Sequence, residues 1–185
     1  MKHIRTLLEM DRQPNAPHQG RLVCREAVRA VILRGRQLLL VHSSVNGDYK
    51  FPGGGTESGE CHESALVREV AEEIGGCITS SLEPFGKAME YDFPLEKDFD
   101  SFCMTSYYFC CEVSPELGDQ QLDEYEARMK MKPVWVDIDE AISNNNELIA
   151  SGKKVMCWVK RETRVLEIVR DELMGRTTFQ KKTRK

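Results

Sequence analysis

The sequence predicts one folded domain of the α/β or α+β class, in which a mixed sheet packs with helices. Short apolar runs bounded by turn residues indicate strands, and amphipathic stretches between them indicate helices. The 185 residues are 41% hydrophobic and 30% charged, a composition typical of a folded chain with a sizeable core. We assign the domain to residues 25–175, with an N-terminal arm at 1–24 and a basic tail at 176–185 that is expected to be disordered.

The first elements follow from local pattern. Two apolar runs, 27–33 and 37–42, flank Arg34-Gly35-Arg36 and are typical of a β-hairpin. A polar loop follows, and then a short extended piece ends at Pro52. A helix is predicted from about Glu60 to Ile74, with Gly75-Gly76 as its stop signal.

The second part of the chain alternates strands and helices. Asp137 with Glu140 three residues later resembles a capping box and marks a helix start. The remaining predictions are a strand at 78–90 interrupted at Pro84 and Gly86, an acidic aromatic loop at 91–100, a long buried strand at 102–113, a turn-rich connection at 114–121, a strand at 134–136 and a last helix at 153–174.

Bulk properties exclude several classes of protein. No apolar run approaches the ~18 residues that a membrane span needs. The seven cysteines are odd in number and form no C-x-x-C pair, so we expect reduced thiols in a cytoplasmic protein. The net charge of −4 argues against a general nucleic-acid coat protein, although the basic tail leaves RNA as an alternative partner.

The predicted helix before Gly75 concentrates negative charge on one side. Glu69, Glu72 and Glu73 fall within roughly a third of its circumference, beside an apolar stripe that includes Leu66 and Val70. Like charges at this spacing repel each other on a helix. A divalent cation would cancel that repulsion, and the glycine-rich turn just before the helix would let the backbone approach it closely.

Residues 54–76 resemble the Nudix box, whose pattern is G-x5-E-x7-R-E-U-x-E-E-x-G-U with U a bulky apolar residue. Only the last position departs, because Gly76 stands where an apolar residue is usual. The fixed positions are occupied by Gly54, Glu60, Arg68, Glu69, Val70, Glu72, Glu73 and Gly75.

The resemblance implies a Nudix fold, an α/β/α sandwich around a central mixed sheet. It also implies Mg²⁺ or Mn²⁺ bound by Glu69, Glu72 and Glu73, with a backbone carbonyl of Gly54 or Gly55. Hard oxygen ligands of this kind favour these cations.

Two further roles follow from the same resemblance. Arg68 is expected to orient a carboxylate of the box, and Glu60 to brace the loop. The catalytic base stays open: Glu126 is favoured, Glu124 is the second choice, and Glu69 is the third.

The substrate is specified less closely. Tyr49, Phe51 and Tyr91 could stack on a base, and Arg29 or Arg34 could meet a phosphate. We expect a pyrophosphohydrolase acting on a nucleoside diphosphate linked to another group, with a nucleoside triphosphate or dinucleotide polyphosphate as the first choice. The alternatives are removal of 5′ pyrophosphate from RNA and a nucleotide-sensing module without catalysis. A homodimer is suggested by the family alone.

Overall fold

The computed structural model describes residues 4–175, and the predicted tail at 176–185 lies outside this range. The chain divides into two compact units. Among the described residues, the first unit comprises 4–31 and 52–121, and the second comprises 32–51 and 122–175. Each unit has its own four-stranded sheet.

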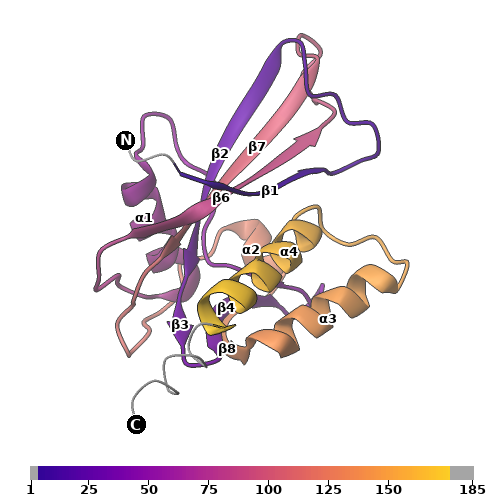
Figure 1. The fold of residues 1–185 in the computed structure, drawn as a ribbon. Helices are drawn as coiled ribbons and strands as arrows, with labels where there is room; N and C mark the ends of the chain where they lie inside the picture. The colour runs from indigo at the N-terminus through magenta and orange to yellow at the C-terminus, as the bar shows by residue number, and fades with distance from the viewer. Residues whose placement is uncertain (1–3, 176–185) are drawn as a thin grey trace. The chain divides into compact units, whose positions relative to one another are not determined.

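The sheet of the first unit is mixed, as the sequence predicted. Its strand order is β1-β6-β7-β2, and Figure 1 shows β2, β7 and β6 running beside one another. The pairs β1–β6 and β2–β7 are parallel, whereas β6–β7 is antiparallel. The strands are β1 Thr6–Asp11, β2 Leu22–Val31, β6 Glu83–Asp92 and β7 Ser101–Cys110.

The first unit also holds the predicted charged helix, α1 (His62–Ile74). Its apolar stripe is fully buried, and the helix contacts β2. It ends where Gly75 adopts a left-handed conformation, with φ of 64°. A side chain at Gly75 would stand 2.2 Å from the carbonyl oxygen of Gly118, so only glycine lets the 114–121 connection pass so close.

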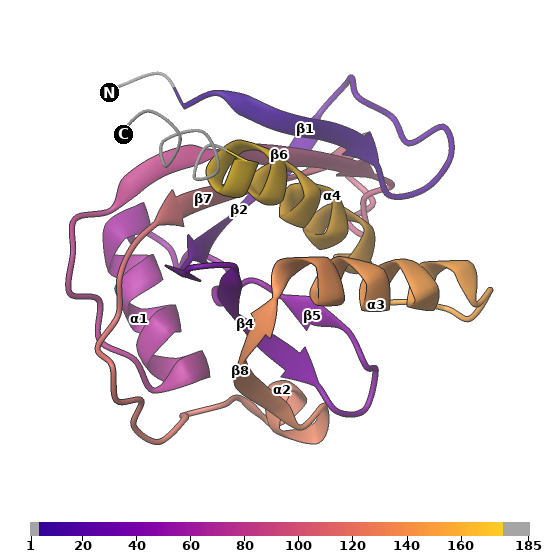
Figure 2. The ribbon, with the colours of Figure 1, turned by 60° about the horizontal axis from the view of Figure 1, so that its bottom comes forward.

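The sheet of the second unit is built around β4, which pairs antiparallel with three other strands. Figure 2 shows β4 between β5 and β8, with α3 and α4 in the same unit. Four consecutive buried residues of β4, at positions 38–41, supply much of the core. The elements are β3 Leu33–Arg34, β4 Gln37–Ser43, β5 Tyr49–Lys50, α2 Glu124–Arg128, β8 Met131–Asp137, α3 Ile138–Ala150, α4 Val159–Val169 and the π-helical turn η1 Arg170–Met174.

Two local predictions were wrong in part. A hairpin does form around Arg34-Gly35-Arg36, but its first arm is only the short β3, because most of the run at 27–33 belongs to β2, which ends at Val31 and pairs with β7. Asp137 caps α3 through the N–H of Asp139, and the capping box is found instead at the start of α2. The apolar pattern within 27–33 does not indicate that its partner is the distant strand β7.

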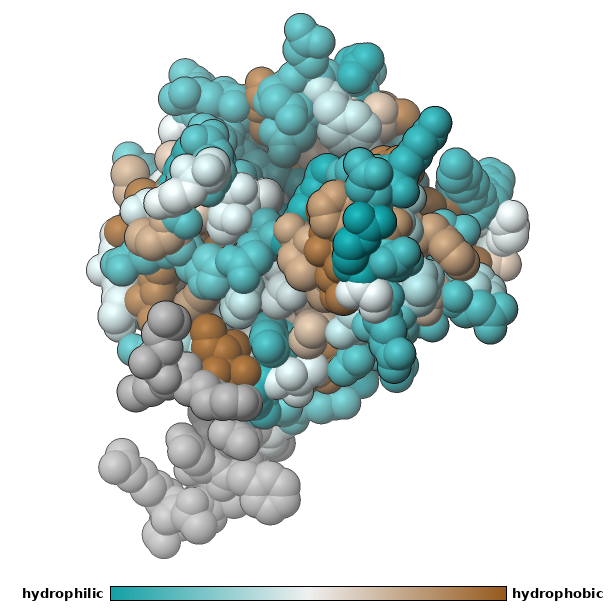
Figure 3. Space-filling model, turned by 90° about the horizontal axis from the view of Figure 1, so that it is seen from above, coloured by the Kyte–Doolittle hydropathy of each residue, from teal (hydrophilic) through white to brown (hydrophobic). Residues whose placement is uncertain are grey.

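The last helix also begins later than predicted. Residues 151–158 are not helical and include Gly152 with a φ of 71°, so the helix starts at Val159. Hydrophilic residues cover most of the face seen in Figure 3. Within residues 4–175, none of the helices is both long and apolar enough to cross a membrane.

Candidate active site around Arg68

The glycine turn that precedes α1 is fixed against β2. The N–H of Val28 donates to the carbonyl of Gly54 over 2.9 Å, and the N–H of Ala30 donates to the carbonyl of Pro52 over 2.8 Å. At Gly53, φ is 132°, and an added Cβ would lie 2.0 Å from the Val28 carbonyl oxygen. At Gly54, an added Cβ would lie 2.5 Å from the Glu69 carboxylate oxygens. The turn therefore has no room for a side chain at Gly53, where backbone atoms are in the way, whereas a side chain at Gly54 would displace the Glu69 carboxylate.

The Gly53→Ala variant tests this packing. We expect its free energy of unfolding to fall by about 1–3 kcal/mol, because the methyl group meets backbone atoms that cannot rotate away. Urea denaturation measures the change. Gly35→Ala is the control, since Gly35 also has positive φ but open space around it. Equal losses in the two variants would contradict a role for close packing.

Arg68 makes hydrogen bonds to several residues of the Nudix-box segment 54–76. Its Nε and Nη2 donate to the two oxygens of Glu60 over 3.0 and 2.9 Å, a bidentate pair. Its Nη1 donates to Glu69 over 2.7 Å and to Glu72 over 3.2 Å, and its Nη2 also reaches the carbonyl of Gly55 over 3.1 Å. The hydrogen bonds from Arg68 are the main reason that the pKa of Glu60 falls to about 2. The Arg68 guanidinium thus binds the carboxylates of Glu60, Glu69 and Glu72 and a carbonyl of the glycine turn.

The three glutamates of the helix have different surroundings. Glu72 is the most open, with its side chain 40% exposed, whereas the side chain of Glu69 is 11% exposed. Glu73 is buried, and its Oε2 accepts a hydrogen bond of 2.7 Å from the N–H of Gly53. Burial raises the pKa of Glu69 above its usual value, although Arg68 opposes the shift. A carboxyl with a raised pKa is better suited to accept a proton than an ordinary one.

The donor set is compatible with a hard divalent cation. Glu69 and Glu72 each place an oxygen within hydrogen-bond distance of the same Arg68 nitrogen, so the two carboxylates converge on one positively charged point. Carboxylate oxygens are the ligands that Mg²⁺ and Mn²⁺ prefer. Across residues 4–175, however, no three His, Cys, Asp or Glu side chains form a metal-binding group. Glu73 is turned toward the glycine backbone instead.

The predicted base Glu126 belongs to the second unit and takes part in a capping box. It is the third residue of α2, and its Oε2 accepts a hydrogen bond of 3.2 Å from the N–H of Asp123. Its Oε1 lies 3.8 Å from the Nζ of Lys50. Glu124, the second choice, is exposed in the first turn of the same helix. These contacts give Glu126 a role in holding the start of α2.

The predicted substrate-binding residues lie in different surroundings. Arg29, on β2, is close enough for its charge to act on Glu69. Phe51 is fully buried in the second unit, so its ring packs in the core and is not accessible to a base. Tyr49 is half-buried on β5, with its ring centroid 4.6 Å from that of His42. Tyr91 is buried on β6 and stacks on His18 at 3.9 Å.

One polar cluster beside the box was not foreseen. Nε2 of His62 lies 2.8 Å from a carboxylate oxygen of Glu26, and the hydroxyl of Tyr107 donates to the same carboxylate over 3.1 Å. The rings of His62 and Tyr107 lie 4.2 Å apart. The sequence held no signal for this group, since the parallel pairing of β2 and β7 is what brings Glu26 and Tyr107 together.

Comparison with known proteins identifies the class. A family model described as the NUDIX domain matches residues 24–159. A match over most of the chain shows membership, so the protein belongs to the Nudix family.

Individual relatives agree with this assignment. An RNA pyrophosphohydrolase of a Nitratiruptor species is 33% identical over 81 residues, which are 42% of this chain and 52% of the relative. Nudix hydrolase 4 of Arabidopsis thaliana is 32% identical over 117 residues, 63% of this chain and 51% of that protein. The matched regions thus span about half the length of these curated relatives.

A solved structure supports the fold. The NUDIX hydrolase from Nitrosomonas europaea superposes with a TM-score of 0.50 and 22% sequence identity. The superposition covers 71% of this chain and 92% of that one. At this level of identity the likeness concerns the fold alone.

Proposed function

We propose that this protein is a divalent-metal-dependent hydrolase that cleaves a pyrophosphate bond in a nucleoside diphosphate linked to another group. Nucleoside triphosphates and dinucleotide polyphosphates are the preferred substrates in this proposal. The observation that carries it is the cluster in which Arg68 holds Glu60, Glu69 and Glu72 beside the glycine turn. A cytoplasmic location and Mg²⁺ or Mn²⁺ as the cation are part of the proposal.

Glu69 and Glu72 are the residues that would hold the cation, together with Glu73 and a carbonyl of Gly54 or Gly55. When bound, the cation would neutralise phosphate charge and lower the pKa of a water molecule. Arg68 fixes the orientation of the carboxylates through charge-assisted hydrogen bonds.

The remaining roles concern the phosphate and the proton. Arg29 would supply positive charge to a phosphate of the substrate, since it lies close enough for its charge to act on Glu69. The proton acceptor stays open: Glu126 is the first choice, Glu124 is the second, and Glu69 is a further alternative.

The proposal is tested by product release from a panel of nucleotides. Triphosphates, dinucleotide polyphosphates, ADP-ribose, nucleotide sugars and coenzyme A are each incubated with Mg²⁺ or Mn²⁺, with and without a chelator. We expect turnover of one or more substrates that disappears with the chelator. If no substrate is turned over although the metal binds, the protein is a nucleotide-sensing module instead of an enzyme.

The names of relatives favour a second candidate, removal of 5′ pyrophosphate from RNA. Several bacterial relatives are RNA pyrophosphohydrolases, including one of Helicobacter pylori that is 40% identical over 60 residues. An 8-oxo-dGTP diphosphatase of Escherichia coli is 47% identical over 45 residues and favours the nucleotide candidate. Adding 5′-triphosphate RNA to the panel distinguishes the RNA candidate from the nucleotide candidate. If RNA is bound through its phosphate charges, its turnover should fall as the salt concentration rises.

A further inference from the structure

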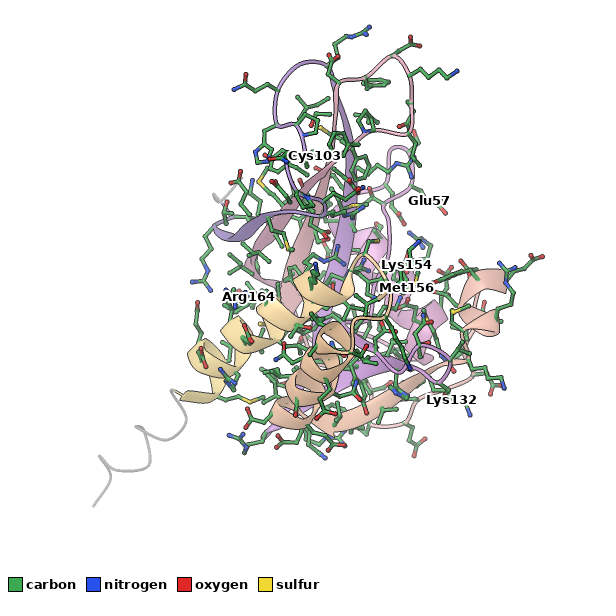
Figure 4. All side chains as sticks on the ribbon, turned by 90° about the vertical axis from the view of Figure 1, so that its right-hand side faces the viewer. Glu57, Cys103, Lys132, Lys154, Met156 and Arg164 are labelled. Carbon is green, nitrogen blue, oxygen red and sulfur yellow. The ribbon has the colours of Figure 1, made fainter. Side chains whose placement is uncertain are left out.

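Two cysteines lie side by side in the sheet of the first unit. Cys24, on β2, is the register partner of Cys103, on β7, and both thiols are free. Adjacent strands are about 4.8 Å apart, and disulfides join Cα atoms that are about 4.4–6.8 Å apart. The two backbone positions are therefore close enough for a disulfide within the existing fold. Figure 4 shows the place of Cys103 in this sheet.

The two side chains also lie on the same face of the sheet. Register partners on neighbouring strands project to the same side, because the pleats of the strands are aligned. The charge of Cys24 acts on the Cys103 thiol, which agrees with this placement. Tyr91, the register partner of Cys103 on β6, shares a side-chain hydrogen bond with Cys103 from the opposite side. Cys103 thus lies between Cys24 and Tyr91 in one row of side chains across three strands.

The two thiols differ in their access to solvent. Cys24 is exposed, on a strand that forms the edge of the sheet, whereas Cys103 is only 4% exposed. Burial raises the pKa of Cys103 above its usual value, and hydrogen bonds with Thr105 and Tyr91 oppose the shift. A dissolved oxidant therefore reaches Cys24 first, and the neighbouring Cys103 can react only with what has formed on Cys24.

No other two cysteines within residues 4–175 are register partners in either sheet. Cys110 and Cys111 are adjacent in the chain, but burial raises their pKa to about 11 and about 12. Thiols are oxidised through the thiolate form and in proportion to their exposure, so this second pair is a poor target. The arrangement of one exposed and one shielded thiol in direct register is found at Cys24 and Cys103.

We propose that Cys24 and Cys103 form a reversible disulfide when the protein is exposed to hydrogen peroxide. This modification site lies outside the Nudix box, and the proposal does not rest on the proposed hydrolysis.

The reaction consumes one peroxide molecule and proceeds in two steps. The Cys24 sulfur attacks a peroxide oxygen, the O–O bond breaks, and the leaving hydroxide combines with the thiol proton to give water and a sulfenic acid on Cys24. The Cys103 sulfur then attacks the Cys24 sulfur, the S–S bond forms and the S–O bond breaks. The hydroxide that leaves takes the Cys103 proton and becomes the second water. Two thiols are oxidised, and the peroxide is reduced to two water molecules.

The place of the bond in the sheet determines its properties. The Cys24 sulfur is at an exposed edge, where a small thiol can attack the disulfide, so the bond should be readily reduced. Further along the same strand, the carbonyl of Glu26 accepts from the N–H of Thr56 over 3.1 Å, and the N–H of Val28 donates to the carbonyl of Gly54. Oxidation would therefore add a covalent link between β7 and the strand that anchors the glycine turn.

Peptide mapping tests the proposal. The folded protein is treated with hydrogen peroxide, its remaining thiols are alkylated, and it is digested with trypsin without reductant. Trypsin releases Cys24 on the peptide 22–25 and Cys103 on the peptide 98–128. We expect these two peptides to be linked, and dithiothreitol to separate them. Fragmentation of the linked species distinguishes Cys103 from the other cysteines of the longer peptide.

Variants assign the two roles. Cys24→Ser should abolish the linked peptide, because the exposed thiol is removed. Cys103→Ser should leave the sulfenic acid on Cys24, and dimedone should then trap at least about fivefold more adduct there than in the parent. Cys103→Ala is the second choice if circular dichroism shows that the serine variant is unfolded. Cys157→Ser is the matched control, since Cys157 is exposed but belongs to the second unit, and it should form the link as the parent does.

Three outcomes would overturn the proposal. The first is no link between Cys24 and Cys103 at peroxide concentrations that oxidise the exposed Cys157. The second is linkage of Cys24 mainly to Cys110 or Cys111. The third is an equal yield in protein unfolded by urea, which would mean that strand pairing does not direct the bond. Because the experiment needs no nucleotide and no metal, its result does not depend on whether the protein is a hydrolase.

Discussion

Replacing Glu72 with glutamine is expected to lower the hydrolytic rate by about 10²–10³-fold, because the cation would lose one of its charged ligands. Glutamine keeps the length of the side chain but removes its negative charge. The side chain of Glu72 is 40% exposed, so its loss should hardly change the free energy of unfolding. The measurement is kcat at saturating metal, with the melting temperature recorded in parallel.

The control for Glu72→Gln is Glu63→Gln, an exposed glutamate in the first turn of the same helix. It removes the same charge from α1 and should leave kcat within about twofold if charge near the helix start is unimportant. Full activity in Glu72→Gln, or equal losses in the two variants, would contradict the assignment of the metal ligands.

Glu73→Gln should lower the rate as well, but it carries a structural cost that Glu72→Gln does not. Glu73 is buried and accepts a hydrogen bond from the N–H of Gly53, so the variant loses a charge-assisted hydrogen bond. A drop in both rate and melting temperature is therefore expected for this position. Comparing kcat and melting temperature between the two variants separates the effect on catalysis from the effect on stability.

Replacing Glu162 with alanine should lower the free energy of unfolding by about 3–5 kcal/mol. Glu162 is fully buried in the second unit, and its Oε1 accepts from Nε and Nη2 of Arg161 over 3.0 and 2.7 Å. Its Oε2 accepts from the N–H of Phe51 over 2.9 Å. Alanine would remove the acceptor for these donors and leave a buried guanidinium without its carboxylate. Urea denaturation, followed by far-UV circular dichroism, measures the loss.

The same helix provides a matched control. Arg164 and Glu167 form an ion pair of 3.0 Å, but the Arg164 side chain is 65% exposed. Glu167→Ala should therefore cost no more than about 1 kcal/mol. If Glu162→Ala were as mild as the control, the buried pair would not be a main support of the second unit.

Much of the candidate site could be predicted because its geometry is local. Glu69, Glu72 and Glu73 share one side of α1 through helical spacing, and the Arg68–Glu72 ion pair has the i,i+4 spacing of a helix. The helix stop at Gly75 follows from local rules as well, whereas the pairing of Arg68 with a box carboxylate was expected from the resemblance to the Nudix box. The different burial of the three glutamates does not follow from local rules, since it depends on what packs against each one.

Contacts between distant segments could not be predicted in this way. Phe51 and Glu162 are 111 positions apart, and Asp48 and Trp158 are 110 positions apart. The partner of β2 was also missed, because an apolar run indicates a strand without indicating which strand it pairs with. Burial could not be predicted for Phe51 either: the sequence analysis proposed its ring as a stacking surface for a base, whereas the ring is buried.

The sequence by itself determined the family, the mixed composition of strands and helices, and the carboxylate helix with its glycine turn. These features depend on spacing within one turn or one helix, where chain geometry leaves few alternatives. Only the tertiary structure decided which carboxylates are buried, that Glu26 contacts His62 and Tyr107, and that Glu162 accepts a hydrogen bond from the N–H of Phe51. Burial and long-range pairing depend on the packing of the whole chain, so these properties are set only when distant segments meet.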